Sequence, residues 1–446
     1  MKPFQLAYVP IGVPTFHMES AHEQFHRSVE LLKSLSPDCV VPAGPLLKLD
    51  DLKAYLDTLN ADLVVLQNNT FANSAFATEV VKSCACPLVL WTLREPVIDG
   101  GRLRLNSLTG AFSAGNLMHH LDRPNFEYVF GGPGEDKVRN TLKAVIGAAR
   151  VKKQLRGLTV ASIGHTPQGF GFGRALDADV VRAFGANLES VEARELMTKA
   201  KSYAAADLTV EWEESRAKMV GLDKLPAENV EAYVRLYKAY KDFVVSKNVQ
   251  ALASRCWPDY FVDYGTPVCG VLGMLNDNLV AAACEADLYG AISMYIGIEL
   301  SHAAVFFGDP VSLDEAANTV TFWHCGTAAC SLARADSGAA MGVHPNRKIG
   351  PTMEFGCKPA EKATVFRVGR KPDGSFRFLV SPGSVLDAPQ QFSGTSLVFQ
   401  PRMNAEQLIT KAVKDGWEPH FVVIYDDVVA ELRVLGSLLG MEVCDY

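Results

Sequence analysis

Apolar runs alternate with amphipathic segments through the first part of the chain. Short apolar runs at 4–11, 62–67 and 86–91 are typical of buried parallel strands. Helical segments separate them, and in the segment 17–35 the apolar positions recur every three or four residues along one face. A further apolar run at 158–163 starts the same alternation again. The pattern predicts an α/β fold with two Rossmann-like parallel-sheet domains.

The pattern changes near residue 364. Three short segments at 364–369, 375–380 and 395–400 alternate apolar and polar residues and are separated by turn residues, which indicates half-exposed antiparallel strands. We therefore predict a C-terminal domain with an antiparallel, barrel-like β part. The expected domains are 1–153 (N-terminal α/β), 154–299 (second α/β, carrying Glu285) and 300–446 (C-terminal, carrying Asp309 and His420).

Composition and charge narrow the class of protein. The 446 residues are 48% hydrophobic and carry a net charge of −7, without a long basic run, which argues against a nucleic-acid partner. No apolar run reaches the roughly 20 residues of a membrane span, and the N-terminus lacks the order of a signal peptide. The ten cysteines are scattered and have no zinc-finger spacing, so they read as free thiols. We expect a cytoplasmic protein that acts on a small polar molecule and not at a membrane.

Polar residues follow two of the predicted strands in the first domain. Gln67, Asn68 and Asn69 end the second apolar run, and Arg94 comes shortly after the third. Ligands bind at this carboxyl edge in open parallel sheets, so the four residues are candidates for contacting a substrate. They could equally cap the helices that follow, and the sequence leaves both readings open.

Carboxylates and histidines interrupt apolar segments in the second half of the chain. Glu285 and Asp287 lie in an alanine-rich stretch, Asp309 follows an apolar run, His324 follows the next run, and His420 precedes another. A buried carboxylate is costly unless it is paired or binds a cation. Glu, Asp and His together suit Mn²⁺ or Mg²⁺. Each residue also has a plain structural reading, as a hydrogen-bonded histidine, a turn residue or a helix cap.

This region resembles the signature of the L-fucose isomerase family, which shares its fold with the L-arabinose isomerases. The matching segments are Cys284-Glu285-Ala-Asp287, Ala291-Ile-Ser-Met294 and Val305-Phe-Phe-Gly-Asp309. Glu285 and Asp309 are 24 positions apart, as is typical of L-fucose isomerases, and His420 matches that family's C-terminal metal histidine in placement. The resemblance covers about residues 155–446. The chain is shorter than L-fucose isomerases proper, and His324 stands where they have a Ser/Asn-rich turn, so it looks like a compact, divergent member.

The resemblance implies a metal-dependent aldose–ketose isomerase that works through an enediol. Glu285 would be a metal ligand and the base, Asp309 a ligand and second base, and His420 a neutral imidazole ligand. His324 is a weaker candidate for orienting the substrate. The implied cofactor is Mn²⁺ or another divalent cation such as Mg²⁺ or Co²⁺, which would polarise the sugar oxygens.

The resemblance also implies a closed homo-oligomer, in which the N-terminal domain of a neighbouring subunit covers the site. Several N-terminal residues would then face the sugar of another subunit: His17, Glu19, Gln67, Asn68, Asn69 and Arg94.

The sequence does not name the sugar. A neutral hexose or deoxyhexose is the first expectation. Arg94, Arg255 and Arg347 offer cations for an acidic sugar, such as a 6-sulfo-sugar of the sulfoquinovose kind, which is the alternative. Two other readings stay open: a non-catalytic sugar-binding protein on the same α/β halves, and a metal-dependent aldolase or epimerase.

Overall fold

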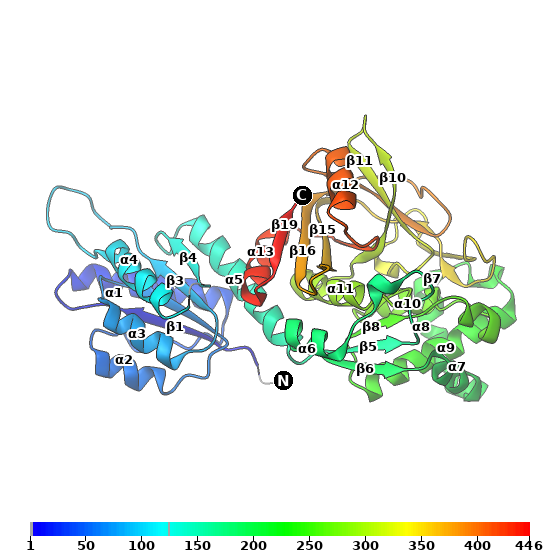
Figure 1. The fold of residues 1–446 in the computed structure, drawn as a ribbon, viewed down its shortest axis with the longest axis horizontal. Coiled ribbons are helices and arrows are strands. Elements are labelled where there is room, and N and C mark those ends of the chain that lie inside the picture. Colours follow the sequence, from blue (N-terminus) through cyan, green and yellow to red (C-terminus); the bar gives the residue numbers. More distant parts are fainter. Residues whose placement is uncertain (1–2, 124) are drawn as a thin grey trace. The chain divides into compact units, whose positions relative to one another are not determined.

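A computed structural model describes residues 3–123 and 125–446, which form two compact units (Figure 1). The unit that we call the N-terminal unit contains the chain up to Lys153 together with Arg433–Gly440. The main unit contains Gln154–Leu432 and Met441–Tyr446. The three-domain division expected from the sequence stays a prediction. No helix in the described part of the chain is long and apolar enough to cross a membrane.

The N-terminal unit is built on a parallel sheet with the strand order β1-β2-β3-β4. Its strands are β1 (Leu6–Ile11), β2 (Leu63–Asn68), β3 (Leu88–Thr92) and β4 (Glu127–Phe130). Its helices are α1 (Met18–Leu35), α2 (Leu49–Leu56), α3 (Ser74–Ser83), α4 (Ser107–His120) and α5 (Asp136–Leu155). Strands β1 and β2 are buried along their whole length, because apolar clusters cover both faces of the sheet.

The main unit begins with a second parallel sheet, in the order β6-β5-β8-β9. Its strands are β5 (Thr159–Ile163), β6 (Asn187–Val191), β8 (Ala251–Ser254) and β9 (Ala281–Ala283). Its helices are α6 (Asp177–Phe184), α7 (Ala193–Ser202), α8 (Thr209–Lys218), α9 (Ala227–Ser246), α10 (Cys269–Asp277) and α11 (Leu288–Ser301). Helix α11 is buried from Leu288 to Ile298, as its nearly continuous apolar sequence requires. The two predicted parallel sheets are thus confirmed.

The C-terminal part of the main unit holds an eight-stranded, mainly antiparallel sheet in the order β14-β17-β11-β10-β18-β15-β16-β19, and β16 also pairs with β17. Its strands are β10 (Phe306–Asp314), β11 (Thr319–His324), β14 (Phe355–Gly356), β15 (Ala360–Arg370), β16 (Phe376–Val385), β17 (Thr395–Pro401), β18 (Phe421–Ile424) and β19 (Glu442–Asp445). Helices α12 (Ala405–Lys414) and α13 (Val429–Leu439) follow β17 and β18. The antiparallel sheet is confirmed, but the expected half-exposed strands are not: β15 is buried on both faces from Ala363 to Gly369, since helix α11 packs against it. Its barrel-like closure stays a prediction.

Short elements complete the main unit. Strands β7 (Met219–Val220), β12 (Ala339–Gly342) and β13 (Thr352–Met353) form a small sheet. Single helical turns are η1 (Gly171–Gly173), η2 (Ala205–Leu208), η3 (Leu222–Lys224), η4 (Tyr260–Tyr264) and η5 (Cys330–Leu332).

Candidate active site

Strand pairing in the main unit brings Asp309 and His420 together. The sequence predicted that a strand ends before Asp309, but β10 continues to Asp314, because Asp309 pairs with Trp323 of β11 across the sheet. On the other side, Gly308 pairs with Phe421 of β18, so the residues flanking this pair, Asp309 and His420, are neighbours. The same register places His324, which follows Trp323, beside them.

Glu285 reaches this sheet from the turn after β9. Glu285 and the next residue, Ala286, have φ angles of 52° and 54°, in the left-handed region that side chains other than glycine rarely adopt. Such a backbone persists only where the surrounding structure holds it in place. The turn is anchored at one end by the Ala286 amide, which donates to the Ser254 carbonyl. At the other end Asp287 caps helix α11 by accepting from the Gly290 amide at 2.9 Å.

The predicted metal ligands therefore converge. His420 Nε2 lies 3.6 Å from Glu285 Oε2 and 3.6 Å from Asp309 Oδ1. His324 Nε2 lies 3.3 Å from the same oxygen of Glu285. Glu285 and both histidines are buried, whereas the side chain of Asp309 is 31% exposed. Glu285, Asp309 and His420 line one cavity of about 480 Å³.

The orientation of His420 is set by Asp287. His420 Nδ1 is 2.9 Å from Asp287 Oδ2, and an ionised carboxylate can only accept, so Nδ1 carries the hydrogen and donates it. A neutral His420 then presents the lone pair of Nε2 toward Glu285 and Asp309. A histidine held by a carboxylate on its far nitrogen is the usual arrangement of a metal ligand.

Asp287 is itself held by a fully buried arginine. Arg367 of β15 donates to both carboxylate oxygens of Asp287, at 2.5 and 3.0 Å. Burial raises the pKa of Asp287, but the Arg367 guanidinium and His420 outweigh it and keep that pKa well below its ordinary value. Asp287 therefore has two roles: it caps helix α11, and it holds His420 in the site.

Neighbouring groups perturb the other acid and the second histidine. Burial raises the pKa of Asp309, and His420 and His324 oppose this effect. Burial alone would lower the pKa of His324, but Cys325 and Glu285 raise it above its usual range. Titratable groups that perturb one another in a cavity are typical of a catalytic site.

Aromatic rings form a wall beside His420. Phe170 and Phe172, from the glycine-rich loop after β5, have ring centroids 6.3 and 5.5 Å from that of His420. The ring centroid of Phe307, on β10, lies 4.8 Å from that of His420. Trp257 packs edge-on against Phe170, with their ring centroids 6.1 Å apart. This wall excludes water from one side of the imidazole.

Two of the three polar candidates at 67–69, Gln67 and Asn69, have hydrogen-bond partners within the N-terminal unit. Gln67 Oε1 accepts from the Tyr8 hydroxyl at 2.5 Å, and Asn69 Nδ2 donates to the Ala21 carbonyl. Asn68 is fully buried, and neither polar atom of its side chain has a hydrogen-bond partner among the described residues. These contacts lie within one unit of one chain, so a role toward the sugar of a neighbouring subunit stays a prediction.

His17 and Glu19 lie at the start of helix α1. His17 is the N-cap: its Nδ1 accepts from the Ser20 amide at 3.3 Å. The Glu19 side chain is 92% exposed and 4.0 Å from His17 Nε2. His17 is therefore a helix cap, and a role of His17 and Glu19 toward the sugar of a neighbouring subunit stays a prediction.

The three candidate arginines differ in their partners. Arg94 donates to both oxygens of Glu135, each at 3.0 Å. Arg255 is ion-paired with Asp259. Arg347 is exposed, with its guanidinium carbon 5.7 and 5.8 Å from the ring centres of Trp257 and Phe261.

Two supporting residues were not selected from the sequence. Arg367 was missed because an alternating, half-exposed strand at 364–369 would place its side chain on the solvent face, whereas the structure buries both faces of this strand. Cys256, whose Sγ is 3.4 Å from Glu285 Oε1, carried no signal in the sequence that would have marked it.

The chain is similar in sequence to several known proteins over nearly its whole length. No protein-family model matches the chain. The sulfoquinovose isomerase of Clostridium sp. (strain MSTE9) is 59% identical over 442 residues, covering 99% of each chain. The sulfoquinovose isomerase of Priestia aryabhattai is 37% identical with 100% of each chain covered, and that of Alkalicoccus urumqiensis is 35% identical with 98% covered.

Solved structures add little. A tagatopyranose-bound solute-binding protein of an ABC transporter from Agrobacterium vitis aligns over 68% of this chain and 90% of its own, at 13% identity. Its TM-score of 0.17 is too low to carry an argument.

Proposed function

The chain belongs to the sulfoquinovose isomerase family, and from this we propose that it converts sulfoquinovose, an aldose with a sulfonate on its terminal carbon, into the corresponding ketose. The protein is an aldose–ketose isomerase and thus an intramolecular oxidoreductase, as expected from the sequence. The alternatives of a non-catalytic sugar-binding protein, an aldolase or an epimerase are set aside. The sulfo-sugar, ranked second from the sequence, replaces the neutral hexose as the preferred substrate.

The observation that carries the proposal is the convergence of Glu285, Asp309 and His420. Ligand atoms that share one cation at about 2.0–2.2 Å lie roughly 3–4.4 Å apart, and His420 Nε2 is 3.6 Å from an oxygen of each carboxylate. Two carboxylates and one imidazole suit Mn²⁺ better than Ca²⁺. We assign these three residues to a divalent cation, Mn²⁺ first, which would polarise the sugar oxygens and stabilise negative charge on them.

The chain's own residues would move the protons. Isomerisation transfers one proton between adjacent carbons and another between their oxygens. Glu285, which Cys256 and His324 hold from two sides, is assigned the carbon-bound proton. Asp309, the more exposed acid, is assigned the oxygen-bound proton. This division follows the resemblance to the L-fucose isomerases, which itself belongs to the proposal.

Arg347 is the best placed of the three candidate arginines to bind the sulfonate. Arg94 and Arg255 are already engaged by carboxylates, whereas no carboxylate in the described chain lies within ion-pair distance of Arg347. The Arg347 guanidinium lies over the ring of Trp257. Trp257 packs against Phe170, which lines the same cavity as His420. A planar guanidinium resting on an aromatic ring can bind a sulfonate through two hydrogen bonds.

The test uses purified protein depleted of metal with EDTA and then freed of the chelator. Ketose formation from sulfoquinovose is followed by NMR before and after Mn²⁺ or Ca²⁺ is added. We expect activity to be lost and then restored by Mn²⁺ more fully than by Ca²⁺. Full activity after exhaustive chelation would contradict the metal assignment. Absence of ketose with every cation would contradict the substrate.

A further inference from the structure

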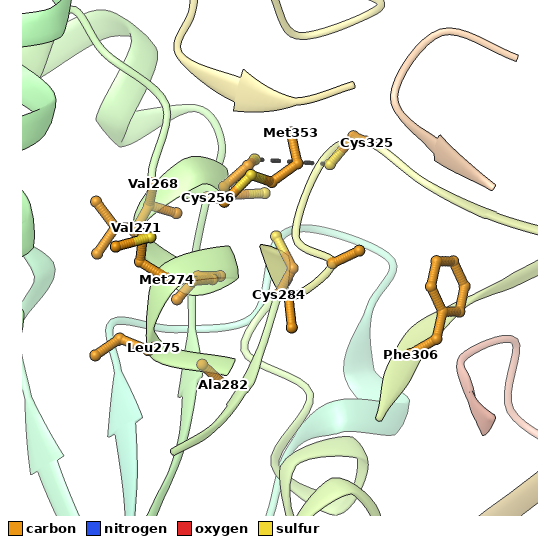
Figure 2. Close-up of a cluster of buried hydrophobic side chains, with 14 of the residues drawn as sticks. Cys256, Val268, Val271, Met274, Leu275, Ala282, Cys284, Phe306, Cys325 and Met353 are labelled. Atoms are coloured by element: carbon orange, nitrogen blue, oxygen red, sulfur yellow. Dashed lines mark hydrogen bonds between the residues drawn. The ribbon is translucent and has the colours of Figure 1, made fainter. Parts of the chain in front are cut away.

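Four buried cysteines form a cluster next to Glu285 and His324 of the candidate site. Cys256, Cys269, Cys284 and Cys325 are each at most 5% exposed, and all are free. Figure 2 shows Cys256, Cys284 and Cys325 gathering from three segments of the chain. The thiol of Cys284 interacts with those of the other three, and the sulfurs of Cys269 and Cys325 are 3.7 Å apart.

Two of these cysteines directly adjoin the site residues in sequence. Cys284 precedes Glu285, and Cys325 follows His324. One ligand atom from each of these four residues can be chosen so that all four lie within 4.8 Å of one another. The set offers two sulfurs, one imidazole nitrogen and one carboxylate oxygen. This is the donor mixture of a zinc-type site and not of a Mn²⁺ or Mg²⁺ site.

One distance in this set suits tetrahedral coordination. Sulfur and nitrogen bound to one Zn²⁺ at about 2.3 and 2.05 Å are about 3.5 Å apart. Cys325 Sγ and His324 Nδ1 are 3.5 Å apart. On the other ring nitrogen, His324 Nε2 lies 3.3 Å from Glu285 Oε2. An imidazole binds a cation through one nitrogen, so a cation shared with both Cys325 and Glu285 would replace one of these two contacts.

We propose that Cys284, Glu285, His324 and Cys325 form a second, soft-metal site that takes a thiophilic divalent cation such as Zn²⁺ or Cd²⁺. The two thiols bind as thiolates and release their protons to solvent. Because the site shares Glu285 with the assigned Mn²⁺ site, the soft cation withdraws the base from the substrate and inhibits turnover. The inhibitory consequence rests on the proposed function, whereas the existence of the site does not.

The experiment titrates Cd²⁺ into the EDTA-treated, chelator-free protein and records sulfur-to-cadmium charge-transfer absorption. We expect a saturable band that is lost in Cys284→Ser and in Cys325→Ser and retained in Cys444→Ser, a partly buried cysteine outside the cluster. The cadmium NMR shift of the wild-type protein reports thiolate ligation without any variant, so the test stands if a variant does not fold. Absence of the band together with a shift typical of oxygen and nitrogen ligands would overturn the proposal.

A second readout separates this inference from the proposed function. Mn²⁺ is bound first and Cd²⁺ is then added, while free Mn²⁺ is followed by EPR and ketose formation by NMR. We expect Cd²⁺ to release Mn²⁺ and stop turnover. A thiolate–cadmium signal in a protein that never forms ketose would support the site and count against the proposed function. Normal turnover without any thiolate signal would contradict the soft-metal site and leave the proposed function standing.

Discussion

Arg367 and Asp287 form a bidentate ion pair in which neither side chain is exposed to solvent. The pair connects β15 of the antiparallel sheet to the start of α11, and Asp287 passes this support on to His420. A buried pair of this kind is poor evidence for stability by itself, because desolvation costs about as much as the attraction returns. Its value here is positional, since it fixes which nitrogen of His420 faces the acids.

Breaking this pair should destabilise the protein. Asp287→Asn leaves the buried Arg367 without the carboxylate to which it donates, and removing one partner of a buried ion pair typically costs about 3–5 kcal/mol. Because the pKa of Asp287 is depressed in the fold, its stabilising effect is complete above its ordinary value of 3.8 and declines as the pH falls below that value. Urea unfolding of Asp287→Asn and wild type at pH 7 measures the loss. Glu442→Gln, which removes the exposed pair with Lys371, is the control and should cost under about 1 kcal/mol. Equal effects in the two variants would contradict the assignment.

Removing the assigned base should abolish most turnover without unfolding the protein. Glu285→Gln keeps the size and the hydrogen bonding of the side chain, and losing a general base lowers kcat by at least about a hundredfold. Ketose formation and circular dichroism are measured on the same samples. Glu361→Gln, a change of the same kind at an exposed position of the main unit, should leave kcat unchanged. Near-normal turnover in Glu285→Gln would assign the base elsewhere.

Asp309→Asn should weaken the binding of Mn²⁺. Losing a direct carboxylate ligand should reduce affinity by at least about a hundredfold, more than the roughly 10–100-fold typical of an outer partner. Calorimetric titration with Mn²⁺ gives the affinity, and Asp314→Asn on the exposed end of the same strand is the control. Unchanged affinity in Asp309→Asn would remove this residue from the ligand set.

Arg347→Ala should lower kcat/KM for sulfoquinovose and leave that for glucose unchanged. A charge-assisted hydrogen bond is worth about 1.5–3 kcal/mol, which corresponds to roughly 10–150-fold. Lys348→Ala, a neighbouring exposed cation, controls for the general loss of positive charge. Arg94→Ala and Arg255→Ala test the other two candidates. A sulfo-sugar preference that survives in Arg347→Ala but vanishes in either of these variants would move the sulfonate site.

The predicted homo-oligomer can be tested at two exposed apolar side chains of the N-terminal unit. Ile98 and Phe112 are 94% and 74% exposed, and a subunit contact at these positions would remove them from water. We expect a closed oligomer by light scattering, and we expect Ile98→Asp with Phe112→Asp to yield smaller, inactive species. Val245→Asp, at a 79% exposed position of α9, is the control. A fully active monomer in the wild type would rule out a site completed by a neighbouring subunit.

Local pattern was sufficient to predict several elements. The apolar runs that became β1, β2 and β3 are buried on both faces, and such continuous apolar segments have few other stable environments. The carboxylates in apolar surroundings were equally informative, because an ionised group there needs a partner whatever the fold. Glu285 and Asp309 were therefore candidates from the sequence alone.

The sequence by itself determined several of the strands and helices and several of the polar residues that require a buried partner, since periodicity and burial cost are local properties. Only the tertiary structure decided who those partners are. Asp287 meets Arg367 80 positions away and His420 133 positions away, and strand register places Asp309 beside His420. The tertiary structure also shows that Arg94 and Arg255 are paired with carboxylates, whereas Arg347 lies over aromatic rings. Long-range pairings of this kind depend on how strands order within a sheet, and the sequence of one strand carries no record of the neighbour it will have.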